Sequence, residues 1–213
     1  MKKIISDIYH KYLKYNFDPI YEEIDFKYIC ETEKVISELY RYRLFHEVNF
    51  KNCKKVLDYG GGYGVNLKII KDIHNDLELN YMDISRNKRS MFKIINENIF
   101  KMSPNILEIN KLKNYEKNFD LVFTDAVLIY INKKNIKDLL RKLINSSKKN
   151  LLFHELTYKF SKDKIDHLNI HDYEKIIKEI NPRLKIKIIK SEKKTHPWNS
   201  HGAKIIVNKY GAN

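Results

Sequence analysis

Residues 55–64 read KVLDYGGGYG, and this stretch is the clearest structural signal in the chain. Its first four residues predict a short strand, and the residues from about 65 to 75 predict a helix. Between them, Gly60, Gly62 and Gly64 stand at alternate positions, where they allow the backbone to turn sharply and to approach a ligand closely. The loop is not a G-x-G-x-x-G dinucleotide fingerprint, because Val65 stands where the third glycine would be, and it lacks the Gly-Lys-Ser/Thr of a Walker loop.

Downstream of this loop, segments typical of strands alternate with segments typical of helices. We expect strands at residues 77–83, 105–109, 119–125 and 150–155, and helices at residues 86–101, 134–147 and 171–180. This alternation predicts an α/β fold, with a mostly parallel sheet that helices cover on both faces. Two final strands, at residues 184–189 and 203–207, have no helix between them and should therefore pair antiparallel.

The first 50 residues differ from the rest of the chain. They are rich in tyrosine, contain no glycine, and carry a stripe of apolar residues at helical spacing between residues 35 and 45. We therefore expect two or three helices here, and two domains: a helical lid over residues 1–50 and a catalytic domain over residues 51–213. Such a lid would close over bound ligands, although ordinary core packing of the tyrosines is equally consistent with the pattern.

Composition and charge exclude several classes of protein. A length of 213 residues with 43% hydrophobic residues suits one folded domain with an appendage, and no apolar run approaches the roughly 18 residues of a membrane span. The net charge is +14, but only 6 of the 41 basic residues are arginine, so we expect a solvated basic exterior rather than a nucleic-acid surface. Cys30 and Cys53 are too few for a disulfide scaffold or a Cys-based zinc site, which suggests a reducing, cytoplasmic location.

An acid followed by G-x-G-x-G resembles the first motif of class I S-adenosylmethionine-dependent methyltransferases. Three further features match that family. Asp83 ends the second strand 19 residues past Gly64, residues 119–131 resemble the fourth strand with its following turn, and the terminal antiparallel pair completes a seven-stranded sheet. The resemblance covers about residues 54–208 and implies a Rossmann-like methyltransferase fold with S-adenosylmethionine as cofactor and S-adenosylhomocysteine as product.

The resemblance also implies roles for residues around the cofactor. Asp58 would hold the methionine end, the backbone at the three alternate glycines would line methionine and ribose, and Asp83 would accept the ribose hydroxyls. The adenine would be contacted by Ile84 and by Ile109, the second of these together with Glu108. The sulfonium would lie beside Asp125 and Ala126. Asp83 as a surface turn acid, and Glu108 as a solvated charge, are the alternative interpretations.

The acceptor should bind beyond the carboxyl ends of the strands, because ligands of open parallel sheets bind there. His154 and Glu155 end the fifth strand and are the candidate catalytic residues, with His154 as the leading general base. The candidate substrate-binding residues are Tyr130, His196, Trp198, His201 and Arg43. Arg43, with Arg41, would either grip a carboxylate or phosphate or lie on a solvated helix face. The histidines have no tight ligand spacing, so we expect no metal site.

The acceptor class is narrowed by one missing motif and one looser resemblance. Residues 124–127 read TDAV, not the D/N-P-P-Y signature of enzymes that methylate amino groups of nucleic acids. Residues 128–131 followed by His154 and Glu155 resemble small methylases of bacterial surface-sugar and capsule pathways. This implies O-methylation of a small molecule, such as a sugar or a capsule phosphoramidate. The alternatives are an RNA or protein methyltransferase, and a cofactor-binding module without turnover.

Overall fold

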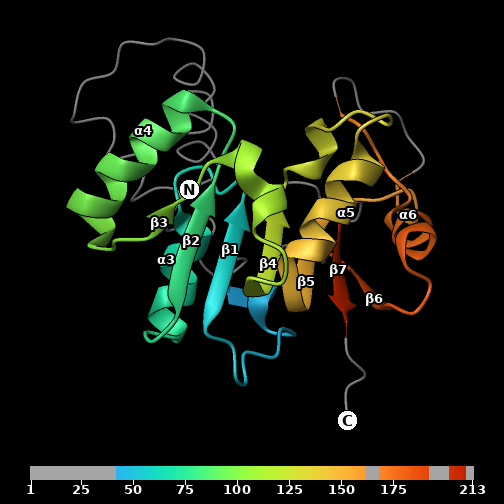
Figure 1. Cartoon of the computed structure of the whole chain (residues 1–213), viewed down its shortest axis with the longest axis horizontal. Helices are drawn as coiled ribbons and strands as arrows, with labels where there is room; N and C mark the ends of the chain where they lie inside the picture. Colours follow the sequence, from blue (N-terminus) through green and yellow to red (C-terminus); the bar gives the residue numbers. More distant parts are fainter. Residues whose placement is uncertain (1–41, 162–167, 192–201, 210–213) are drawn as a thin grey trace, which may run out of the picture. The chain divides into compact units, whose positions relative to one another are not determined.

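The computed structural model of the chain describes residues 42–161, 168–191 and 202–209 (Figure 1). Across these ranges, seven strands form one sheet in the order β3-β2-β1-β4-β5-β7-β6. The strands are β1 (Lys55–Tyr59), β2 (Glu78–Met82), β3 (Asn105–Ile106), β4 (Phe119–Asp125), β5 (Ser147–Leu156), β6 (Lys185–Lys190) and β7 (Gly202–Asn208). Neighbouring strands from β3 to β5 pair parallel, whereas β7 pairs antiparallel with both β5 and β6. The predicted seven-stranded, mostly parallel sheet with an antiparallel terminal hairpin is confirmed.

Helices connect the strands at the predicted places, with some different bounds. They are α3 (Val65–Ile73), α4 (Arg86–Ile95), α5 (Ile136–Ser146) and α6 (Tyr173–Ile180), with short turns η1 (Asn96–Phe100), η2 (Ile109–Asn114) and η3 (Leu128–Tyr130). The helix expected over residues 86–101 ends at Ile95 and continues as one wider π turn. The strand expected over residues 105–109 is only two residues long, because the chain enters the 3₁₀ turn η2 at Ile109.

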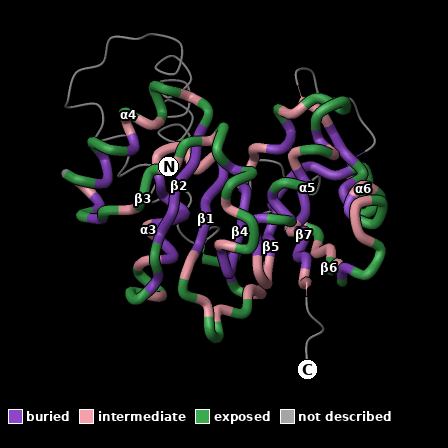
Figure 2. Tube along the Cα trace, viewed as in Figure 1, coloured by how far each residue is buried: buried purple, intermediate pink, exposed green. Residues whose placement is uncertain are grey.

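Helices pack against both faces of the sheet. On one face, Leu57, Val122 and Phe153 of the strands join Leu140 of α5 and Tyr173 of α6 in the main hydrophobic core. The central strands are therefore buried along most of their length, as Figure 2 shows. Each fully buried side chain of this size stabilises the fold by about 1.5–3 kcal/mol, so the central strands form a rigid support for the loops at their ends.

The opposite face carries aromatic contacts from helices and from the N-terminal segment. Phe92 of α4 stacks on Tyr81 of β2 with ring centroids 3.6 Å apart. Phe45 meets Phe123 of β4 edge to face at 5.1 Å. Residues 42–45 are helical, and residues 42–50 belong to the same compact unit as the sheet. The lid expected over residues 1–50 falls mostly outside the described residues and stays a prediction.

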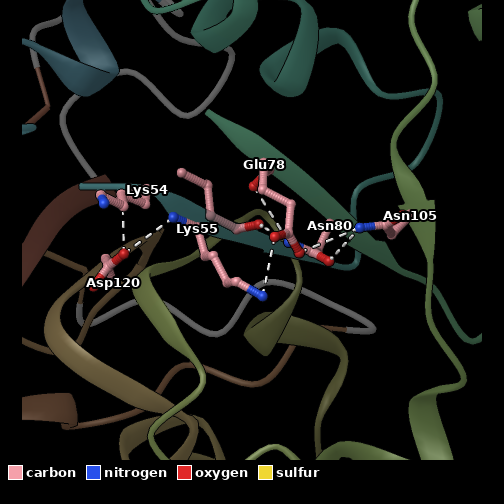
Figure 3. Close-up of polar contacts among 7 residues, drawn as sticks. Lys54, Lys55, Glu78, Asn80, Asn105 and Asp120 are labelled. Atoms are coloured by element: carbon pink, nitrogen blue, oxygen red, sulfur yellow. Dashed lines mark hydrogen bonds and ion pairs between the residues drawn. The ribbon is translucent and has the colours of Figure 1, made fainter. Parts of the chain in front are cut away.

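A polar network joins the amino ends of the strands, at the edge opposite the glycine loop (Figure 3). The Asp120 carboxylate of β4 accepts hydrogen bonds from the backbone N–H groups of Lys54 and Lys55, at 2.9 and 3.0 Å. Asn105 of β3 donates to Asn80 of β2 at 3.2 Å, and Asn80 donates to the carbonyl of Val56 in β1 at 3.1 Å. These side chains replace water at strand ends that would otherwise leave polar groups unpaired, and so they fasten four strands together away from the candidate site.

Among the described helices, none has the length and apolar character that crossing a bilayer requires. Cys53 is half-buried, and burial raises the pKa of its thiol to about 11, so the thiol stays protonated near neutral pH. Cys30 lies outside the described residues.

Candidate active site

The loop between β1 and α3 has the backbone conformation that its glycines predict. Gly60, Gly62 and Gly64 have φ angles of 79°, 55° and 85°, in the left-handed region that favours glycine. The loop is fixed to β2, since the N–H groups of Gly60 and Gly61 donate to the carbonyl of Met82 at 2.7 and 3.2 Å. The loop is therefore an ordered turn at the carboxyl ends of β1 and β2.

The space around each glycine shows which of them face a ligand site. A Cβ on Gly60 would lie 2.5 Å from Val127, and a Cβ on Gly64 would lie 2.6 Å from Phe92, so both positions are filled by packing. A Cβ on Gly62 would have no heavy atom within 4 Å. Gly62 is therefore the point where the loop backbone borders open space.

Asp83 follows β2 and joins the loop to the start of α4. Its Oδ2 accepts a hydrogen bond from the N–H of Gly62 at 3.1 Å, and its Oδ1 accepts one from the N–H of Ser85 at 2.8 Å. The side chain of Ser85 in turn caps α4. An ionised carboxylate has about four acceptor positions, so these two bonds leave capacity for a ligand's hydroxyl groups at the edge of the loop.

Two tyrosines that sequence reasoning did not single out support this arrangement. The hydroxyl of Tyr81 donates to the carbonyl of Gly62 at 2.9 Å, and burial together with the charge of Asp83 raises its pKa. Burial and the same carboxylate raise the pKa of Tyr59, at the end of β1, to about 12. Tyr81 lies in β2 and precedes Asp83, just after that strand, by two residues; side chains two apart in extended chain share a face. The spacing of Tyr81 and Asp83 is therefore the sequence signal from which the position of Tyr81 beside the loop could have been predicted.

The residues beside the loop differ in how accessible they are. Asp58 is buried beneath Gly61, where a Cβ would meet its carboxyl group at 2.8 Å. The side chain of Ile84 is 80% exposed, although it is apolar and directly follows Asp83. Arg89 donates to the carbonyls of both Asp83 and Ile84, at 2.7 and 2.8 Å, and so fixes the backbone that presents these two side chains.

The carboxyl ends of β4 and β5 carry a chain of polar contacts. His154 Nδ1 lies 2.8 Å from Asp125 Oδ1, and His154 Nε2 lies 3.0 Å from Ser191 Oγ. Asn66, in the first turn of α3, donates to Asp125 Oδ2 at 3.2 Å. Neither Asn66 nor Ser191 was predicted from the sequence. The contacts join the glycine-loop helix to the segment after β6, which are distant in the chain.

Glu155 makes a different set of contacts on the other side of the sheet. Its Oε1 accepts three hydrogen bonds, from Thr124 Oγ1 at 2.8 Å and from the N–H groups of Val127 and Leu128 at 3.1 Å each. Burial raises the pKa of this carboxyl group to about 7, against the lowering effect of these hydrogen bonds. Glu155 thus holds the turn after β4, where Ala126 takes a φ of 60°, a conformation that is strained for a residue other than glycine.

His154 and Glu155 therefore point to opposite faces, as successive residues of a strand do. Their side chains are almost completely buried, at 1% and 0% exposure. The sequence predicts them as a catalytic pair. The structure instead connects His154 with Asp125 and Glu155 with the backbone of the following turn, and catalysis by either residue stays a prediction.

The other predicted residues are more scattered. Tyr130 is 68% exposed on η3. Arg43 is exposed, and its carbonyl accepts a hydrogen bond from Lys204. Glu108 is exposed and pairs with Lys111, whereas Ile109 lines a small pocket together with Tyr59. His196, Trp198 and His201 lie outside the described residues. Within the described ranges, no cluster of three or more His, Cys, Asp or Glu side chains could hold a metal ion.

Comparison with known proteins identifies the fold. No family model and no curated protein sequence matches the chain. Among solved structures, an O-methyltransferase family protein from Burkholderia thailandensis is similar, with 14% identity over 86% of this chain and a TM-score of 0.66. The S-adenosylmethionine-dependent methyltransferase SibL matches 86% of the chain at 17% identity, with a TM-score of 0.61. A methyltransferase of the same cofactor class from Archaeoglobus fulgidus matches 85% at 17% identity, with a TM-score of 0.59.

The matches cover different shares of these proteins. This chain spans 59% of the Burkholderia protein and 57% of SibL, but the whole length of the Archaeoglobus protein. The likeness establishes the fold, an α/β fold with a seven-stranded mixed sheet that is also found in methyltransferases.

Proposed function

We propose that this protein is an S-adenosylmethionine-dependent methyltransferase. The observation that carries the proposal is the loop at Gly62, where the backbone borders open space and its N–H donates to the Asp83 carboxylate. A carboxylate beside a glycine whose backbone borders open space, at the carboxyl edge of a parallel sheet, suits the ribose of a nucleoside ligand. The fold that this chain shares with known methyltransferases supports the same proposal.

The residues present fit the adenosyl part of that cofactor. Asp83 retains acceptor capacity for two adjacent hydroxyls, and the exposed Ile84 offers an apolar surface next to it for a flat base. Ile109, near Tyr59, would border the base from the other side. Asp58, beneath the loop, carries the charge that suits an ammonium group at the methionine end.

When bound, S-adenosylmethionine supplies an electrophilic methyl group on a sulfonium, and the protein's contribution is orientation and the exclusion of water. Asp83 and the glycine loop orient the ligand from one side. Asp125 and Ala126 lie at the end of β4, and Glu155 fixes the turn that follows them by accepting three hydrogen bonds. We therefore assign Glu155 a positioning role, rather than direct contact with the acceptor.

For the acceptor, we propose a hydroxyl group on a small molecule. The pairing of His154 with Asp125 supports this, since a histidine oriented by a carboxylate can take a proton from an alcohol. The narrower proposal of a sugar or phosphoramidate of capsule biosynthesis rests on the sequence resemblance of residues 128–131 and 154–155. Tyr130, exposed at this end of the sheet, and Arg43 stay candidate acceptor contacts.

Calorimetry with S-adenosylhomocysteine tests the proposal directly. The wild-type protein should bind this product, and Asp83→Ala should bind it about 5- to 150-fold more weakly, the cost of about 1–3 kcal/mol for leaving hydrogen-bonding groups without a partner. Asp83→Asn keeps one acceptor oxygen for the N–H of Gly62. This variant therefore separates the loss of ligand hydrogen bonds from the loss of loop structure. Asp138→Ala, at an exposed acid on α5, is the matched control. No binding to wild type, or equal binding by Asp83→Ala, would refute the proposal.

A further inference from the structure

We propose that Ser191 is the acceptor-facing end of a proton relay that runs through His154 to Asp125, an assignment that rests on the proposed methyltransferase function. From the sequence, His154 is the leading candidate for the general base, with Glu155 as the second catalytic candidate. The structure shows three groups in series at the carboxyl ends of β4, β5 and β6, with separations of 2.8 and 3.0 Å. Both distances are within normal hydrogen-bond range.

The contacts of Asp125 determine which nitrogen of His154 carries the proton. An ionised carboxylate only accepts hydrogen bonds. Asp125 Oδ2 accepts from Asn66 Nδ2, and Oδ1 faces His154 Nδ1, so Nδ1 is the protonated nitrogen of the neutral ring. His154 Nε2 is then an acceptor, directed at the hydroxyl of Ser191. In this tautomer the imidazole is ready to receive a proton from Ser191.

Burial determines where an acceptor can touch this series. The side chain of His154 is 1% exposed and that of Asp125 is 9% exposed, whereas Ser191 is partly exposed. Ser191 directly follows β6, and its N–H donates to the carbonyl of Gly202 at 2.9 Å. The residue is therefore anchored by its backbone, and its hydroxyl contacts the buried imidazole from a partly exposed residue. An acceptor alcohol would reach Ser191 before it could reach His154.

The same geometry argues for a relay rather than for acyl transfer by Ser191. A serine nucleophile requires donors for an oxyanion, often its own N–H. The N–H of Ser191 is already used in the bond to Gly202. A relay requires no such donors, because no bond to the serine oxygen forms.

The acceptor hydroxyl gives its proton to Ser191 Oγ, while the proton of Ser191 moves to His154 Nε2. The electron pair of the broken O–H bond stays on the acceptor oxygen, which becomes the nucleophile. His154 becomes an imidazolium beside the ionised Asp125, and afterwards returns its proton through Ser191 to solvent.

Nitrogen-15 NMR of the His154 ring tests the central contact without any acceptor or cofactor, with the ring resonances identified by their loss in His154→Gln. At neutral pH, the wild-type ring should show a protonated Nδ1 and an unprotonated Nε2 that accepts a hydrogen bond. We expect Ser191→Ala, which removes the donor to Nε2, to shift the Nε2 resonance downfield and to leave Nδ1 protonated. Ser146→Ala, at a buried hydroxyl on α5 that donates to the carbonyl of Leu143, is the matched control and should give the wild-type resonances.

The outcomes separate the relay from its alternatives. A protonated Nε2 in the wild-type ring, or an Nε2 resonance that does not move in Ser191→Ala, would overturn the relay. Catalytic hydrolysis of p-nitrophenyl acetate that depends on Ser191 would overturn it in favour of acyl transfer. Binding of S-adenosylhomocysteine to Ser191→Ala should stay within twofold of wild type, and failure of wild type itself to bind would refute the proposed function instead. With an acceptor alcohol, Ser191→Ala should lower kcat by about 100-fold or more.

Discussion

Replacing Glu155 by glutamine should change how the stability of this protein depends on pH. In the folded protein, burial raises the pKa of Glu155 from 4.5 to about 7. An acid with a raised pKa keeps its proton longer in the folded state than in the unfolded state. Its contribution to stability is therefore complete below about pH 4.5 and is lost as the pH rises through about 7. Glutamine has nearly the same shape as glutamate but does not ionise in this range. The variant therefore does not lose stability at this position as the pH rises.

The magnitude follows from the two pKa values. Each tenfold difference in proton affinity corresponds to about 1.4 kcal/mol, so full ionisation of Glu155 costs the folded state on the order of 3 kcal/mol. Most of this cost falls between pH 5 and pH 8. Over that interval, the unfolding free energy of Glu155→Gln should rise by about 2–3 kcal/mol relative to wild type. The amide group of the glutamine can also destabilise the variant if it lacks a hydrogen-bond partner. That cost is the same at pH 5 and at pH 8, so it does not alter the change between the two pH values.

Urea unfolding at pH 5 and pH 8, followed by circular dichroism, measures the effect. Glu97→Gln, at an exposed position, is the control, and its unfolding free energy should run parallel to that of wild type. If Glu155→Gln also runs parallel to wild type, within about 0.5 kcal/mol, the carboxyl group is not held protonated by burial and our account of the turn after β4 is wrong.

Two further predictions concern the glycine loop and the amino-end network. Gly62→Ala should lower the free energy of unfolding by about 1–2 kcal/mol because of the positive φ at this position, and should weaken binding of S-adenosylhomocysteine at least tenfold. Gly60→Ala, whose Cβ would lie 2.5 Å from Val127, should lower the free energy of unfolding in urea by about 2–5 kcal/mol. Equal stabilities of the two variants would contradict the packing described. Asp120→Asn should destabilise the protein by about 1–3 kcal/mol at pH 7. Although burial raises the pKa of Asp120, its two backbone hydrogen bonds lower it overall. Its stabilising effect is thus present above the ordinary value of 3.8 and is lost as the pH falls, so acid unfolding curves of variant and wild type should converge.

Local sequence patterns predicted most of the fold, because buried parallel strands and glycine turns have strong signatures. The strand at residues 119–125 has the predicted bounds, and the glycine loop has the expected positive φ angles. The third strand was predicted too long, since Leu107 and Ile109 are apolar whether the chain continues a strand or enters a 3₁₀ turn.

The candidate site was harder to predict, because its contacts join residues that are far apart in the chain. Asp83 could be found from its position after a strand. Nothing local indicated that Ser191 would lie 3.0 Å from His154, which is 37 residues earlier. Likewise, adjacency of His154 and Glu155 suggested a pair, but strand alternation separates them onto two faces.

The order of strands in the sheet has a consequence for the folding of this chain during its synthesis. Among the described strands, β6 pairs with β7 alone, and β7 fills the place between β5 and β6 although it is made after both. Until the ribosome has released residues 202–208, β6 lacks the one neighbour that it has among the described strands, and Ser191 has no carbonyl of Gly202 to anchor it. The nascent protein could thus complete its glycine loop early, while the segment that carries Ser191 would be held in place only after the last strand is inserted.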